Sequence, residues 1–133
     1  CNSFTQALLQ GLHDLDWHTL KLALYTSSAT LGPTTTAFST TNESSGTNYT
    51  SGGATISNVA VSLSGTVAFV DFDDVSFSSA TISDAAGALI YNSSASNRAI
   101  AVLDFGGTKS VSSGTLTVTL PSASATTALI RIS

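Results

Sequence analysis

The chain has 133 residues, of which only 9% are charged and 43 are serine or threonine, and its formal net charge is −4 at pH 7. None of its four basic residues lies between Lys21 and Arg98, so the clustered cations that nucleic-acid binding requires are missing. A single cysteine excludes an internal disulfide, and no apolar run approaches the ~20 residues of a membrane-spanning helix.

The first segment, residues 1–18, is predicted to be helical at its start. Ser3 followed by Gln6 fits a capping box. Apolar residues recur at helical spacing at Phe4, Ala7, Leu8 and Leu12. Because so short a helix does not hold together alone in water, it must dock on its own domain or on a neighbour. We therefore predict an interface made of Phe4, Leu8, Leu12 and Trp17.

A strand and a long connection follow. Leucines alternate with other residues over residues 19–26, which is the period of a strand. Residues 27–53 are then predicted to form a long polar loop, and connections of this length are often functional in compact domains.

From Gly53 onward the pattern is that of an all-β protein. Short apolar segments are separated by turn signals such as Ser64-Gly65 and Gly106-Gly107. The first of these segments contains Ile56, Val59, Val61 and Leu63, and the clearest alternates Leu116, Val118 and Leu120 with threonines. Residues 1–133 are thus predicted to form one domain, a β-sandwich or jelly-roll-like fold of about eight strands with a short N-terminal helix.

The only acidic cluster is Asp71, Asp73 and Asp74. On a strand, Asp71 and Asp73 would share a face. Three hypotheses follow: an oxygen-ligand site for Ca²⁺, a paired-carboxylate glycosidase centre, or a strand end whose carboxylates bond local backbone amides. No calcium-loop pattern follows the cluster, which favours the third.

Other catalytic patterns are weak. His13 and His18 lie five residues apart without a nearby cysteine, so a zinc site would need distant ligands. No G-x-S-x-G nucleophile elbow and no phosphate-binding glycine loop occurs. The sequence therefore predicts a protein that is not an enzyme and uses no cofactor.

The cysteine is the first residue of the sequence, Cys1. One hypothesis is a bacterial lipoprotein that carries its acyl chains on this residue, which would place the protein on a membrane. The alternative hypothesis is that the protein has residues before Cys1 that are absent from this sequence.

Several segments together resemble a known family. They are Asn2-Ser3-Phe4 with Leu8-Leu9, and the stretches 22–31, 41–53, 87–94 and 101–107. In this order they are similar to a family of small proteins encoded in the structural-gene regions of tailed bacteriophages. The resemblance implies a part of the virus particle and no catalytic or binding residue.

The function predicted first is a bacteriophage virion structural protein that binds the capsid exterior as an oligomer, as decoration or cement proteins do. Its partners would be copies of itself and other virion proteins, above all the major capsid protein. The alternatives are a tail-associated module (tube, adaptor or fibre-attached) and a secreted or lipid-anchored β-rich adhesin or fibre subunit.

Overall fold

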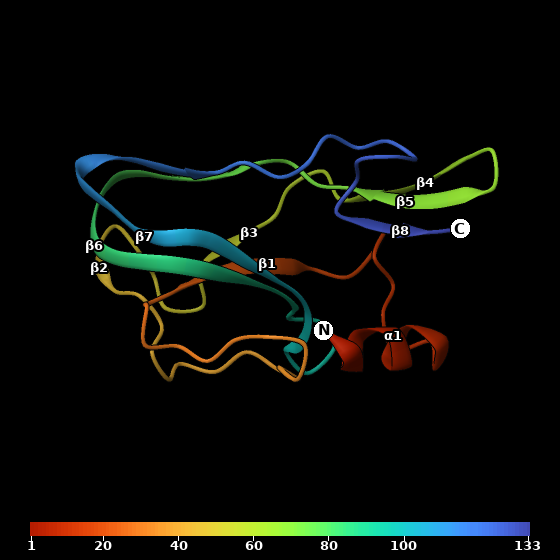
Figure 1. The fold of residues 1–133 in the computed structure, drawn as a ribbon, viewed down its shortest axis with the longest axis horizontal. Helices are drawn as coiled ribbons and strands as arrows, with labels where there is room; N and C mark the ends of the chain where they lie inside the picture. The colour runs from red at the N-terminus through yellow and green to blue at the C-terminus, as the bar shows by residue number, and fades with distance from the viewer.

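The computed structural model describes all 133 residues, as one short helix and eight strands (Figure 1). The elements are α1 (Asn2–Leu9), β1 (Leu20–Tyr25), β2 (Gly46–Thr47), β3 (Ala54–Thr55), β4 (Ala60–Ser64), β5 (Val67–Asp71), β6 (Val75–Asn92), β7 (Arg98–Val118) and β8 (Ile130–Ile132). The prediction of an all-β fold of about eight strands with a short N-terminal helix is confirmed.

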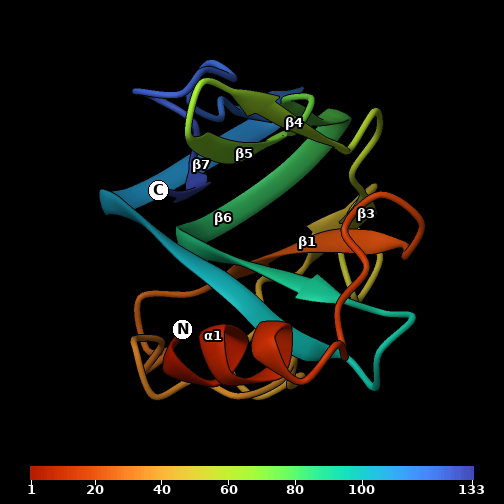
Figure 2. The ribbon, with the colours of Figure 1, turned by 90° about the vertical axis from the view of Figure 1, so that its right-hand side faces the viewer.

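Two long strands build most of the molecule. β6 and β7 form an antiparallel hairpin that bends back over itself, so that each strand contributes to two layers (Figures 1 and 2). At the bend the register passes from Ala85↔Lys109 to Gly87↔Asp104, so the four β7 residues 105–108 lie opposite the single residue Ala86. Such bulges bend a strand without ending it, which explains why separate predicted strands are continuous here.

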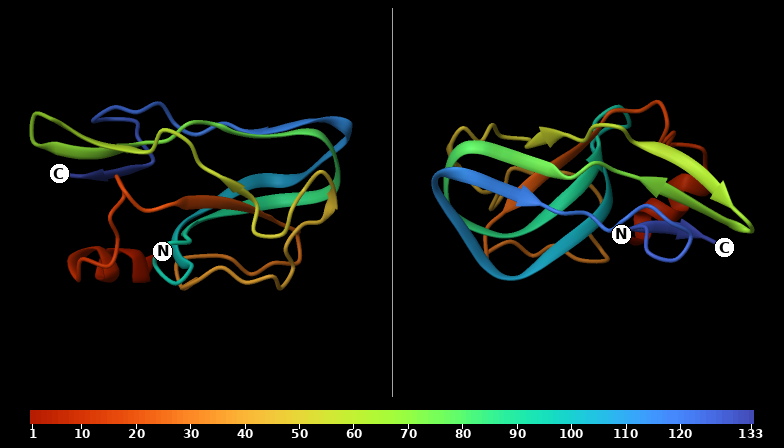
Figure 3. Two further views of the ribbon diagram at one scale, coloured as in Figure 1. Left: turned by 180° about the vertical axis from the view of Figure 1, so that it is seen from behind. Right: turned by 90° about the horizontal axis from the view of Figure 1, so that it is seen from above.

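The two layers differ in width. The lower layer has the order β3-β1-β6-β7 and uses the second half of β6 and the first half of β7. The upper layer pairs residues 75–82 of β6 with residues 111–118 of β7, and β2 joins it at the bend. A separate sheet, β4-β5-β8, extends from one end of the molecule, at the same end as α1 (Figures 1 and 3).

Both faces of β1 are buried. Leu20, Leu22 and Leu24 point into the main core between the layers, as their alternation predicts. Ala23 and Tyr25, on the other face, belong to a second apolar cluster, so β1 is not the half-buried strand that alternation alone indicates.

The long polar loop covers this second face. Phe38 stacks on Tyr91 with ring centroids 4.7 Å apart, and the Tyr25 hydroxyl donates a 2.6 Å hydrogen bond to the carbonyl of Ser39. The loop therefore forms a layer of its own beneath the sandwich, and it also contains the short strand β2.

Two local predictions are wrong. The capping box does not form: Cys1 is the N-cap of α1 without a side-chain cap, and the Ser3 hydroxyl bonds the carbonyl of Thr35 instead. The apolar segment from Ile56 to Leu63 is not one core strand either, because all five residues of β4 are exposed while Ile56 is buried.

Candidate functional site: an apolar surface at the helix end

The exposed large hydrophobic residues all belong to α1, to the segment between α1 and β1, or to β4 and β8. The helix and these two strands lie at one end of the molecule (Figure 1). We call these exposed residues the helix-end surface, and they are Leu9, Leu12, Trp17, Val61, Leu63 and Ile132. Leu9 is 90% exposed, Trp17 86% and Leu63 73%. A single exposed leucine is ordinary, whereas several exposed apolar side chains at one end of a molecule make that end the first candidate for a contact with another molecule.

Strand register explains the three members of this surface that come from the small sheet. Val61 is paired with Val70, Leu63 with Ala68, and Ala68 in turn with Ile132. Residues paired across an antiparallel sheet point to the same side, so one face of the small sheet presents six aliphatic residues, completed by Ile130, and no charge.

The same face borders a cleft against the helix. The cleft has a volume of about 340 Å³, and its walls include Leu8 from α1, Leu15 from the following turn, and Val61 and Ile130 from the sheet. It is a concave apolar site of the kind that receives a side chain of a partner.

A turn held by carboxylates places Trp17 at the surface. Asp14 Oδ1 accepts hydrogen bonds from the backbone N–H groups of Asp16 and Trp17, each 3.2 Å long. Asp16 Oδ1 accepts a 2.7 Å bond from the N–H of Val61. The two carboxylates therefore fix the tryptophan turn and tie it to β4.

The four predicted interface residues lie in three different environments. Phe4 is buried in the core of its own chain, with its ring centroid 5.1 Å from that of His13, so its prediction as an interface residue is corrected. Leu8 lines the cleft, whereas Leu12 and Trp17 are exposed on the helix-end surface. Leu9, Val61, Leu63 and Ile132 were not predicted, since period-two alternation in β4 and β8 resembles that of core strands.

The two histidines meet on one buried amide. Asn92 is fully buried, and its Nδ2 lies 3.0 Å from Nδ1 of His13 and 2.9 Å from Nδ1 of His18. Asn92 Oδ1 accepts bonds from the N–H groups of Ser94 and Ala95, so Nδ2 is the donor and both imidazoles accept. The amide clamps the segment after α1 to the end of β6, and it needs both rings unprotonated at Nδ1.

This arrangement predicts that the free energy of unfolding falls in mild acid. Burial, followed by the charges of Arg98 and His18, lowers the pKa of His13 from its usual 6.5. The folded state therefore binds a proton less readily than the unfolded state, so stability is constant above about pH 6.5 and decreases as the pH falls below it. Urea unfolding at pH 7.5 and pH 5.5 measures the difference. The variant His13→Gln should show a smaller difference, and an equal one would contradict the role of His13.

The acidic cluster does not gather as a ligand set. Asp73 Oδ2 accepts a 2.7 Å bond from Nδ2 of Asn58, and Asp74 Oδ1 accepts a 2.8 Å bond from the N–H of Leu120. Asp71 pairs with Ala60 at the end of β5. No group of three or more His, Cys, Asp or Glu side chains is placed to hold a metal ion. Neither bond goes to a local backbone amide, as the third hypothesis states, because Asn58 contributes a side chain and Leu120 is 46 residues from Asp74.

Comparison of the chain with protein-family models, with curated proteins and with solved structures finds no match. None of its helices has the length and apolar character to span a membrane. The fold and the site together define an all-β protein with exposed apolar side chains at one end.

Proposed function

We propose that this protein is a structural protein of a bacteriophage virion that decorates the outside of the capsid and contacts the major capsid protein through the helix-end surface. The observation that carries the proposal is the set of exposed aliphatic and aromatic side chains at the helix end, two of which, Val61 and Ile132, line a cleft of about 340 Å³. The segments similar to tailed-phage structural proteins support the same role.

The chemistry of the surface suits attachment to a lattice. An interface derives most of its affinity from a few apolar anchors at its centre, surrounded by a polar rim. Here Trp17, Leu9 and Leu63 are the anchors, and the carboxylates of Asp14 and Asp16 stand beside them. Many copies on one particle would add avidity to a modest single contact.

Labelling of intact particles of the virus that encodes this chain tests the proposal. Antibodies against the purified protein, with gold detection or cryo-EM, should place it on the capsid exterior. Labelling confined to the tail would overturn the capsid assignment in favour of a tail-associated module. Particles without the protein would overturn the virion role.

A pair of variants tests the surface itself. Leu9→Ser combined with Leu63→Ser should weaken attachment to virus particles that lack this protein at least tenfold. The reason is that truncation of a central anchor costs about 2 kcal/mol or more of binding free energy. Both side chains are largely exposed, so the midpoint of thermal unfolding should hardly change. The matched control is Val67→Ser, on the opposite face of the same sheet, which should bind like the native protein. Equal binding by the double variant and the control would contradict the assignment.

A further inference from the structure

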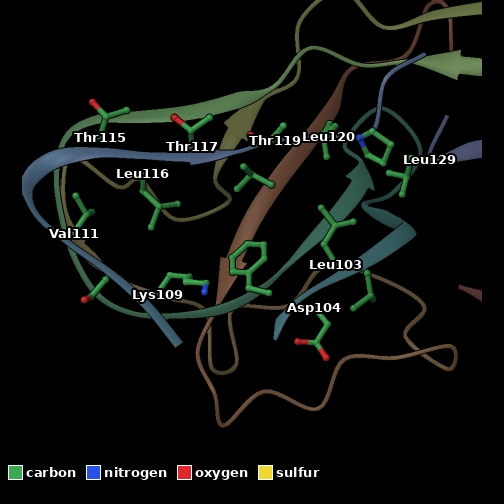
Figure 4. Close-up of a pocket in the computed structure, with 15 residues that line it drawn as sticks. Leu103, Asp104, Lys109, Val111, Thr115, Leu116, Thr117, Thr119, Leu120 and Leu129 are labelled. Carbon is green, nitrogen blue, oxygen red and sulfur yellow. The ribbon is translucent and has the colours of Figure 1, made fainter. Parts of the chain in front are cut away.

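A second apolar region lies on another side of the molecule, between the two layers. We call the part of β7 in the lower layer its lower arm and the part in the upper layer its upper arm. The two arms run one above the other and border a groove of about 710 Å³ (Figure 4). Its lining includes Leu103 and Phe105 from the lower arm and Val111, Leu116 and Val118 from the upper arm. The groove opens along β7, so the sandwich is not closed on this side.

The upper arm of β7 is an unpaired edge. β7 pairs with β6 alone, and outside that pairing no backbone–backbone hydrogen bond involves residues 103–119. The beginning of β7 is different, because the N–H of Ala99 bonds the carbonyl of Thr36 in the long loop. The free edge is therefore confined to the part of β7 that borders the groove.

The upper layer is narrower than the lower layer. The lower layer has four strands, whereas over residues 75–80 the upper layer is a ribbon of β6 and β7 alone. A two-stranded ribbon is marginal by itself and covers only part of a four-stranded layer. β7 is the outermost strand of both layers, so a second chain beside its upper part would widen the ribbon on the side where the groove opens.

The edge is protected only at its start, by a bulge between Val111 and Gly114 where Ser113 has a φ of +49°. Residues 110–120 contain no charge, and the first proline after the bend is Pro121. Natural proteins protect long edges with lysine, proline or short strands. The nearest charges on β7 are Lys109 and Asp104, both at the bend.

We propose that a second copy of this chain pairs with this edge, antiparallel along residues 114–120 with a twofold axis near Thr117, and that the joined upper layers cover the groove. The contact lies apart from the helix-end surface and goes beyond the proposed function. Twofold dimers are the commonest symmetric assembly.

The residue pattern of this segment favours pairing with the same segment of a second copy. With Thr117 on the axis, Leu116 lies opposite the partner's Val118 on the groove side, and Thr115 lies opposite the partner's Thr119 on the outer side. Gly114 lies opposite the partner's Leu120 and leaves room for it. A twofold contact brings Thr117 against its own symmetry mate and the rest of the segment against residues of the same segment, so a charged edge would repel itself, whereas this uncharged one does not.

Substitutions that place a charge at Thr117, on the twofold axis, test the dimer. The native protein should sediment as a dimer at micromolar concentration. Thr117→Lys and Thr117→Glu should each sediment as monomers, because like charges meet on the axis, and an equal mixture of the two should restore the dimer. Thr117 is exposed, so both variants should fold. A monomeric native protein, or a dimer indifferent to these charges, would overturn the proposal.

Cross-linking locates the axis independently of particle binding. In a Cys1→Ser background, Thr117→Cys should form a disulfide-linked dimer under mild oxidation. Ser78→Cys, an exposed position on β6 of the same layer, is the matched control and should stay monomeric. Because neither experiment uses virus particles, failure of this dimer and failure of the virion role are distinguishable.

Discussion

Gly53→Ala should destabilise the fold more than a glycine-to-alanine substitution at any other glycine of the lower layer. Gly53 has φ +75°, and a Cβ at this position would lie 1.8 Å from the carbonyl oxygen of Leu22 and 2.7 Å from Cα of Ala23. Both atoms are backbone of β1, so no side-chain rotation relieves the contact. The chain before β3 must move away from β1, and we expect a loss of about 3–5 kcal/mol.

The matched control is Gly65→Ala. Gly65 has a similar φ of +60° in the β4–β5 turn, but a Cβ there meets nothing within 4 Å. Only the conformational cost of a left-handed alanine remains, about 1–2 kcal/mol. Urea unfolding of both variants separates the close approach from the backbone strain, and equal losses would show that the approach to β1 does not matter.

Glu43→Ala should be the second severe variant. Glu43 is the only glutamate of the chain, and its carboxylate accepts bonds from the Tyr49 hydroxyl at 2.8 Å, the Ser51 hydroxyl at 2.7 Å and the Gly52 N–H at 2.6 Å. The Tyr49 hydroxyl accepts a buried 2.9 Å bond from the N–H of Leu24 in β1. The glutamate thus holds the end of the long loop against the central strand.

The expected loss is about 3 kcal/mol, because hydrogen bonds to a charged group contribute about 1.5–3 kcal/mol each and are not additive within one network. Burial raises the pKa of Tyr49 well above its usual value, so the phenol stays protonated and its donor would be left unpaired. Urea unfolding gives the loss, and proteolysis within residues 43–53 reports loosening of the loop.

Asp104→Ala provides the comparison for Glu43→Ala. Asp104 is an exposed carboxylate that accepts one bond, from the N–H of Gly106. Its removal should cost about 1 kcal/mol or less. If both variants lost the same stability, Glu43 would have no special role in the loop.

The binary pattern of the sequence determined the class of the fold and most of the core. Leu20, Leu22 and Leu24 are buried as their alternation predicts, and so are Leu116 and Val118. The helical start of the chain was also predicted. These features are local, because side chains alternate across a strand whatever its neighbours are.

The tertiary structure decided which apolar strands are covered. Val61 and Leu63 have the same alternation as Leu20 and Leu22, yet they are exposed because β4 joins a small sheet that no second layer covers. Conversely, Tyr25 lies on the face of β1 opposite the leucines and is buried because the long polar loop folds back over it. Burial depends on contacts between residues far apart in the chain, and alternation along one strand contains no information about them.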